Sequence, residues 1–147
     1  MTEVIRADAL TRIYQQGTVH VDALRGVSIT VSQGEFTALV GPSGSGKSTL
    51  LNLLGLLDSP TSGEVFLGSE RVSGQSKKRA ATVRLEHIGF VFQAYNLLPV
   101  LTAFENAEYT LLLQGKSTNE RRERVIPLLE RMGLADAMHR RPHELSG

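Results

Sequence analysis

This sequence of 147 residues lacks several features that would each indicate a class of protein. It has no cysteine, which excludes disulfides, thiolate nucleophiles and cysteine-based zinc sites. Its 16 Lys and Arg residues nearly balance 15 Asp and Glu residues, so there is no electrostatic footprint for nucleic acid or an anionic membrane. No apolar run approaches the ~20 residues that span a bilayer, and Glu3 and Asp8 argue against a secretory signal. We therefore expect a soluble intracellular α/β domain.

The first third of the chain has the patterns of β structure. Apolar and polar residues alternate over 27–32, the period of a half-buried strand, and further strands are expected to open at Val4 and Val19. Two short runs, 36–40 and 88–92, are almost wholly apolar. Such runs are typical of strands buried on both faces of a parallel sheet, so we expect both to be core strands.

Helical patterns fill most of the remaining chain. Helices are predicted over 47–57, 77–86 and 102–114. Ser117 stands three residues before Glu120, which is the spacing of a capping box. A fourth helix is therefore expected to begin there.

A glycine-rich loop joins the first apolar run to the first predicted helix. It matches the phosphate-loop pattern G-x-x-x-x-G-K-[ST] at every fixed position. Backbone N–H groups near Gly44 and Gly46, and the helix N-terminus behind them, can converge on a triphosphate. Lys47 adds a positive charge at the β- and γ-phosphates, and Ser48 offers a hydroxyl to Mg²⁺. The predicted binding residues are Gly41, Pro42, Ser43, Gly44, Ser45, Gly46, Lys47, Ser48 and Thr49.

Further segments, in order along the chain, resemble the ATP-binding domain of ABC transporters. Tyr14 stands where that family places an aromatic side chain that stacks on adenine. Gln93 follows Gly-Phe-Val-Phe and matches the glutamine loop, which contacts Mg²⁺ and the attacking water. Leu145, Ser146 and Gly147 match the first three residues of the Leu-Ser-Gly-Gly-Gln signature. In this order and together with the phosphate loop, these segments indicate the family far more specifically than any one of them does alone.

Other stretches favour one branch of the family. Residues 88–93, followed by 96–99 and 101–106, are similar to the lipoprotein-releasing and macrolide-exporting ATPases. The same holds for 54–58 followed by 61–64. This similarity does not indicate the cargo.

The resemblance implies a fold and a division of the chain. The expected class is α/β, a P-loop NTPase core portion over 36–93 with an N-terminal, mainly antiparallel β-subdomain over 1–35. The start of an α-helical subdomain, with the glutamine loop, is expected over 94–147.

The resemblance also implies ATP and Mg²⁺ as cofactors, and two partners. In the family, two ATP-binding domains pair head to tail and work with a membrane-spanning permease. Lys47 and Gln93 would be the catalytic positions, Ser48 and Gln93 would contact Mg²⁺, and Ser146 and Gly147 would reach the γ-phosphate held by the partner domain. The chain would lie peripherally on the cytoplasmic face of the cell membrane, and no nucleic-acid partner is expected.

The family pattern is incomplete in this sequence. No run of four apolar residues followed by Asp-Glu occurs, and no switch histidine is identified. We therefore expect a domain truncated within its signature, and an isolated chain of this length that is marginally stable because strand neighbours are missing. Two interpretations stay open: an ATPase subunit of a transporter, or a nucleotide-binding module without catalysis.

An apolar stretch follows the glutamine. It comprises Tyr95, Leu97, Leu98, Pro99 and Leu101. Apolar surface of this extent on a loop suggests a protein contact, and the family docks its membrane subunit near the first four of these residues. The alternative is that these side chains tuck under the helical subdomain, and the two are not exclusive.

Other classes have less support. A P-loop GTPase or small-molecule kinase needs a guanine-selective motif or an acceptor pocket, and neither is found. His87, His139 and His143 lack metal-ligand spacing, so no metal site is assigned to protein ligands alone.

Overall fold

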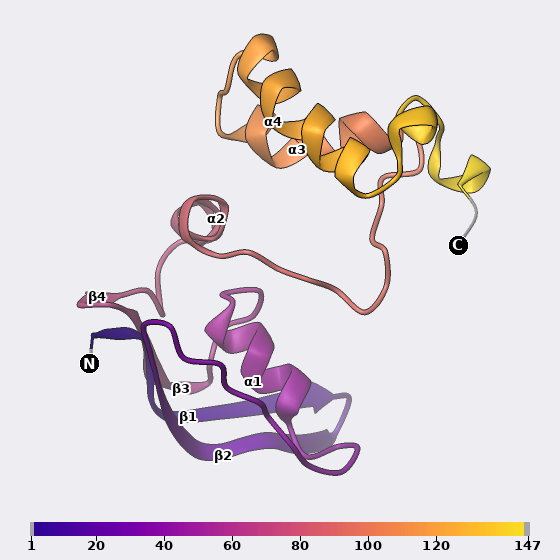
Figure 1. Cartoon of the computed structure of the whole chain (residues 1–147). Helices are drawn as coiled ribbons and strands as arrows, with labels where there is room; N and C mark the ends of the chain where they lie inside the picture. The colour runs from indigo at the N-terminus through magenta and orange to yellow at the C-terminus, as the bar shows by residue number, and fades with distance from the viewer. Residues whose placement is uncertain (1, 146–147) are drawn as a thin grey trace. The chain divides into compact units, whose positions relative to one another are not determined.

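The computed structural model describes residues 2–145, apart from the side chain of Gln16. The chain divides into two compact units, Met1–Ile88 and Gly89–Gly147. Figure 1 shows a sheet with two helices in the first unit and a helical pair in the second.

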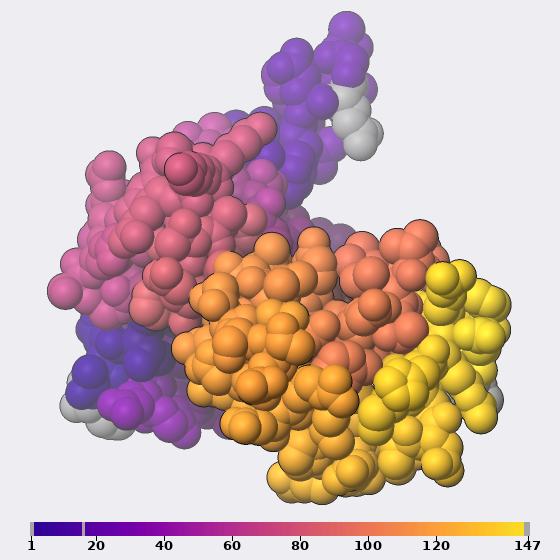
Figure 2. Space-filling model, turned by 90° about the horizontal axis from the view of Figure 1, so that it is seen from above, coloured from indigo at the N-terminus to yellow at the C-terminus, as the bar shows by residue number. Residues whose placement is uncertain are grey.

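The first unit is built on a four-stranded antiparallel sheet. Its strands are β1 (Glu3–Gln16), β2 (Val19–Ser32), β3 (Ser62–Leu67) and β4 (Glu70–Arg71), in the order β2-β1-β3-β4. The predicted antiparallel β structure is thus confirmed. The strands expected to open separately near Val19 and over 27–32 are one strand. In Figure 2 the end of the β1–β2 hairpin extends away from the rest of its own unit.

Helix α1 (Lys47–Leu54) covers one face of this sheet (Figure 1). Leu53 is fully buried, and Val83 of α2 (Lys77–His87) joins the same cluster. This packing places the N-terminus of α1, and the loop that leads into it, against β2. The core consists of Ala7, Leu10, Leu24, Leu50, Leu53, Leu54, Leu56, Val65, Val72 and Val83.

The two apolar runs do not form the predicted core strands. Residues 36–40 and 88–92 have neither helix nor strand structure. Phe36 is 95% exposed and Val40 is 92% exposed. A parallel strand needs hydrogen-bonded neighbours and helices over both faces. In residues 2–145 no strand pairs with either run, so an apolar pattern alone does not make a strand here.

The second unit is a pair of capped helices, α3 (Ala103–Leu113) and α4 (Thr118–Arg131). Two short 3₁₀ turns follow, Ala135–Ala137 and Pro142–Glu144. The predicted capping box of Ser117 with Glu120 is present, and Thr102 with Glu105 forms another. Each hydroxyl accepts from the N3 amide while the glutamate accepts from the cap residue, so both helix starts are defined by local sequence.

Candidate nucleotide-binding site

The phosphate-loop residues gather around one recess in the first unit. Residues 43–49 line it together with Val21, Asp22 and Ala23 of β2, and its volume is about 270 Å³. The loop is exposed over 41–45, so a solute can reach it. The structure therefore brings together seven of the nine residues that the motif predicted, on the lining of a single hollow.

Glycine is required at position 46 for two independent reasons. Its φ is +90°, in the left-handed region, where a side chain is strained. A Cβ at this position would lie 2.6 Å from the Ala23 carbonyl oxygen and 2.9 Å from Cδ2 of Leu24. Gly46 thus lets the loop pass close to the β2 backbone. Gly44 has φ +79°, and a Cβ there would meet no atom within 4 Å, so only the backbone conformation favours glycine at that position.

The start of α1 differs from the other helix starts. Ser76, Thr102 and Ser117 cap α2, α3 and α4 through their hydroxyls, whereas Gly46 gives α1 no side-chain cap. The first turn of α1 also contains no acidic residue. Amide donors and the positive end of the helix dipole are therefore left to an anion from outside the helix.

The Lys47 ammonium lies across the mouth of the loop. Its Nζ donates to the carbonyl oxygens of Gly41 at 2.8 Å and Pro42 at 2.7 Å, and to Ser45 Oγ at 3.2 Å. These bonds use all three donors of the ammonium on uncharged acceptors. Phosphate oxygens would make stronger, charge-assisted bonds with the same group. The lysine is thus kept beside the recess in a position from which it can exchange partners.

Tyr14 lies on β1, outside the residues that line the recess, but one strand away from it. It pairs across the β1–β2 ladder with Val21, which does line the recess. The Tyr14 hydroxyl donates to Asp58 Oδ2 at 2.9 Å, and the Arg12 guanidinium carbon lies 4.5 Å from the ring centroid. The aromatic side chain is thus fixed by neighbours to which the sequence analysis gave no role.

The remaining predicted site residues belong to the second unit. Gln93 is exposed, and Ser146 and Gly147 lie outside the described residues. The predicted partner-contact residues are all exposed, Tyr95 by 83%. None of them is buried within its own unit. They are Tyr95, Leu97, Leu98 and Pro99.

Asn106 of α3 organises this stretch, a role that motif reasoning missed. Its amide oxygen accepts from the Leu98 amide at 2.8 Å. Its nitrogen donates to the carbonyl oxygens of Leu98, Leu101 and Thr102 at 3.2, 3.1 and 2.9 Å. An asparagine four residues after a helix cap was the available signal, because its short amide can reach the backbone before the cap.

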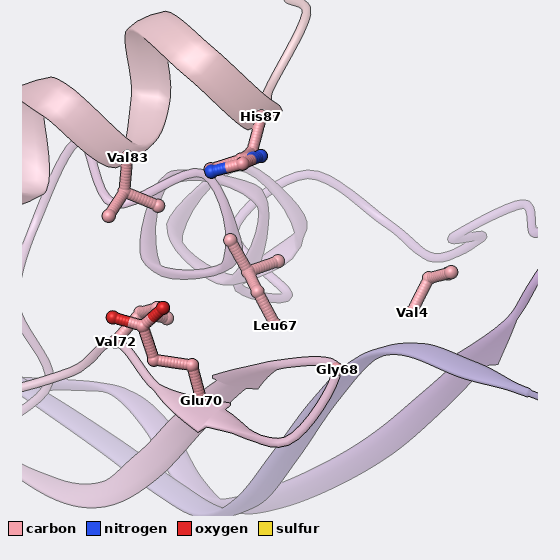
Figure 3. A pocket seen from close by; sticks show the side chains of 7 residues that line it. All are labelled: Val4, Leu67, Gly68, Glu70, Val72, Val83 and His87. Carbon is pink, nitrogen blue, oxygen red and sulfur yellow. The ribbon is translucent and has the colours of Figure 1, made fainter.

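A second recess lies elsewhere in the first unit, between β3, β4 and α2 (Figure 3). It measures about 300 Å³, and its lining comprises Val4, Leu67, Gly68, Glu70, Val72, Val83 and His87. Glu70 accepts from Arg79 at 2.9 Å and from Gln75 at 3.5 Å, and these hydrogen bonds hold the pKa of its carboxyl below the usual value. A carboxylate already paired in this way is a poor general base. No predicted site residue lies in this recess.

The described residues contain neither a metal-binding cluster nor a membrane-spanning helix. Among residues 2–145, no three His, Cys, Asp or Glu side chains are grouped so that they could hold a metal ion. Within the same residues, no helix combines the length and apolar character that crossing a membrane requires.

Comparisons with known proteins agree with the motifs. The ABC transporter family model matches residues 24–147. The chain is 51% identical to an uncharacterized ABC transporter ATP-binding protein of Thermotoga maritima, over all of the chain and 63% of that protein. It is 44% identical to the lipoprotein-releasing system ATP-binding protein LolD of Aquifex aeolicus, over all of the chain and 64% of that protein.

Solved structures show the same fold. The chain matches a dimeric structure of MJ0796, a bacterial ABC transporter cassette, with a TM-score of 0.89 and 39% identity. A post-hydrolysis dimer of that cassette bound to ADP and Pi gives a TM-score of 0.88 at 38% identity. Both matches cover 97% of this chain and 63% of the cassette, so the chain spans just under two thirds of the length of these relatives. The α/β P-loop fold and a family match over most of its length show that this chain belongs to the ABC transporter family.

Proposed function

We propose that the chain binds Mg-ATP in the recess at residues 43–49, as the ATP-binding part of a transporter subunit that couples ATP binding and hydrolysis to transport. The observation that carries this proposal is the uncapped start of α1 beside the Lys47 ammonium. Both features offer hydrogen-bond donors and positive potential to a dense anion at one place.

The residues of the recess suit ATP with Mg²⁺. Ser48 lines the recess and supplies a hydroxyl oxygen, the ligand type that a hard cation prefers. When bound, Mg²⁺ would neutralise charge on the β- and γ-phosphates. Lys47 and the amides at the start of α1 would orient the phosphates. This is catalysis by positioning and charge stabilisation, because phosphoryl transfer leaves little covalent chemistry to the protein.

The remaining roles follow the family. Tyr14 would stack on adenine, and Gln93 would contact Mg²⁺ and the attacking water. Ser146 and Gly147 would reach the γ-phosphate bound by a second ATP-binding domain in a head-to-tail dimer. The dimeric state of the MJ0796 cassette supports such pairing.

The partner in the membrane would be a permease. The exposed residues Tyr95, Leu97, Leu98 and Pro99 support this proposal, since an apolar loop surface of this kind marks a protein contact. The subunit would then sit on the cytoplasmic face of the cell membrane through that contact. One relative whose name includes a permease, the macrolide export ATP-binding/permease protein MacB of Hyphomonas neptunium, is 46% identical to the chain over 144 residues.

A second candidate is a nucleotide-binding module without catalysis. Phosphate release measured beside nucleotide binding separates the two candidates. Release of phosphate during binding supports the ATPase, and binding with no release supports the module.

The test of the site is Lys47→Ala, assayed with a fluorescently labelled ATP because the chain has no tryptophan. We expect Mg-ATP affinity to fall about 10- to 100-fold, the range for loss of a hydrogen bond to a charged group. The matched control is Lys77→Ala, an exposed lysine at the start of α2 in the same unit. Unchanged affinity in Lys47→Ala would refute the assignment.

A further inference from the structure

Tyr14 of β1 is held by the side chains of Arg12 and Asp58. The Asp58 carboxylate bonds to both of the other residues: Oδ2 accepts from the Tyr14 hydroxyl at 2.9 Å, and Oδ1 accepts from Arg12 Nη2 at 2.8 Å. The Arg12 guanidinium also lies against the Tyr14 ring, 4.5 Å from its centroid. The ring is thus restrained at its hydroxyl and on one face, so a planar ligand would have to stack on the opposite face.

The restraint is well shielded from solvent and from competing partners. The Arg12 and Asp58 side chains are 24% and 26% exposed. The Arg12 Nε is buried without a hydrogen-bond acceptor, which is consistent with a guanidinium committed to the ring rather than to further polar groups. Asp58 Oδ1 also accepts from the Ser59 amide at 2.7 Å, so the backbone orients the carboxylate.

Helix α1 connects these contacts of Tyr14 to the phosphate loop. Lys47 begins α1, and Asp58 follows its end, where the Asp58 amide donates to the Asn52 carbonyl oxygen at 3.2 Å. Eight helical residues span about 12 Å. Tyr14 is also tied to the recess through its ladder partner Val21. The ring is therefore set at a defined position relative to the phosphate-binding end of α1.

We infer that Asp58, together with Arg12, is a positioning residue for the nucleoside part of the ligand: it holds the Tyr14 ring pre-oriented so that a purine base stacks while the phosphates occupy the recess. This inference rests on the proposed function. Holding the ring in advance removes the cost of ordering that side chain on binding. The alternative is that the three residues only join β1 to the end of α1, as a purely structural contact.

A comparison of two ligands separates these alternatives. ATP and inorganic tripolyphosphate share the phosphates, but only ATP has a base, so a base-positioning residue affects their affinities differently. The variants are Asp58→Ala and Tyr14→Phe, and the latter keeps the ring and leaves the Arg12–Asp58 pair and the Ser59 contact intact. We expect ATP affinity to fall about 3- to 10-fold, the cost of ordering one side chain, with tripolyphosphate affinity changed less than about twofold. The effects of the two substitutions on ATP affinity should be non-additive in the double variant, because both remove the hydrogen bond between Tyr14 and Asp58.

The control is Glu64→Gln, a carboxylate of β3 paired with Arg71 at 2.6 Å in the same unit. It should leave both affinities unchanged. Equal loss of ATP and tripolyphosphate affinity in Asp58→Ala, or an unchanged ATP-to-tripolyphosphate ratio in Tyr14→Phe, would overturn the inference. Lys47→Ala tests the proposed function separately, because it should lower the affinity for both ATP and tripolyphosphate. If Lys47→Ala lowers neither affinity, the proposed function itself fails.

Discussion

The two units of this chain are stabilised in different ways. The first unit has a cluster of ten buried apolar residues contributed by the sheet, α1, α2 and the adjoining loops. In the described part of the second unit, only Ala103, Val125 and Leu129 are buried apolar residues. The polar contacts of that unit include two capping boxes and an ion pair that joins Arg121 of α4 to Glu108 of α3 at 2.7 Å.

This difference explains where a rigid binding loop can be built. The phosphate loop approaches β2 at Gly46 and is followed by a helix with three buried leucines. The second unit instead leaves much of its apolar surface exposed, including Leu113, Leu128 and Met132. A well-packed core resists deformation, whereas a lightly packed helical pair opens at lower free energy. The proposed phosphate-binding loop thus belongs to the better packed unit.

Removing a core side chain of the first unit should have the largest effect. Leu53→Ala takes a fully buried side chain out of the cluster, and we expect a loss of about 2–5 kcal/mol in the free energy of unfolding. The matched control is Leu112→Ala on α3. The Leu112 side chain is 47% exposed, so its removal should lower the free energy of unfolding much less. Urea unfolding with hydrogen exchange in each unit measures both. Equal losses would contradict the contrast between the units.

Breaking the ion pair of the second unit should have an intermediate effect. Arg121 and Glu108 are each 13% exposed, and Arg121 Nη1 also donates to the Lys116 carbonyl oxygen at 2.7 Å. Arg121→Ala leaves the Glu108 carboxylate partly buried without this partner. We expect a loss of about 1–3 kcal/mol, as for hydrogen bonds to charged groups.

Amide exchange in α3 and α4 measures this loss. The neighbouring Arg122→Ala is the control, because Arg122 is exposed and its loss should change protection little. If both variants behave alike, the partly buried pair does not stabilise the helical unit.

Removing one helix cap should have the smallest effect. Ser117→Ala deletes the hydroxyl that accepts from the Glu120 amide, and we expect a loss of about 1 kcal/mol. Exchange at the first amides of α4 should rise while α3 is unaffected. Protection in α1 should also be unchanged, because that helix belongs to the first unit.

The same cap should respond to acid. Hydrogen bonds from the Ser117 amide and hydroxyl hold the pKa of Glu120 below its usual value. The ionised form is therefore favoured in the folded state, and its contribution is present above the unfolded pKa of about 4.3. That contribution should be lost as pH falls from there through the lowered folded pKa. An NMR titration of the Glu120 carboxyl measures the shift, and Ser117→Ala should raise the pKa toward its usual value.

Features that depend on nearby residues were predictable from the sequence. The Ser117 capping box and the helix starting at Lys47 appear where the patterns place them. The apolar runs 36–40 and 88–92 were wrongly expected to be strands. A strand requires a hydrogen-bonded neighbour, and a residue pattern does not specify where that neighbour is.

At the site, the glycine-rich loop was predictable from the sequence, because such a turn and the following helix form from consecutive residues. The close approach at Gly46 was not predictable, since the atoms that a Cβ would meet belong to Ala23 and Leu24 on β2. The link between Tyr14 and Asp58, which are 44 positions apart, also depends on the tertiary structure. Contacts over such distances exist only once a core has closed the intervening loop against its entropy, and no local pattern of residues contains that information.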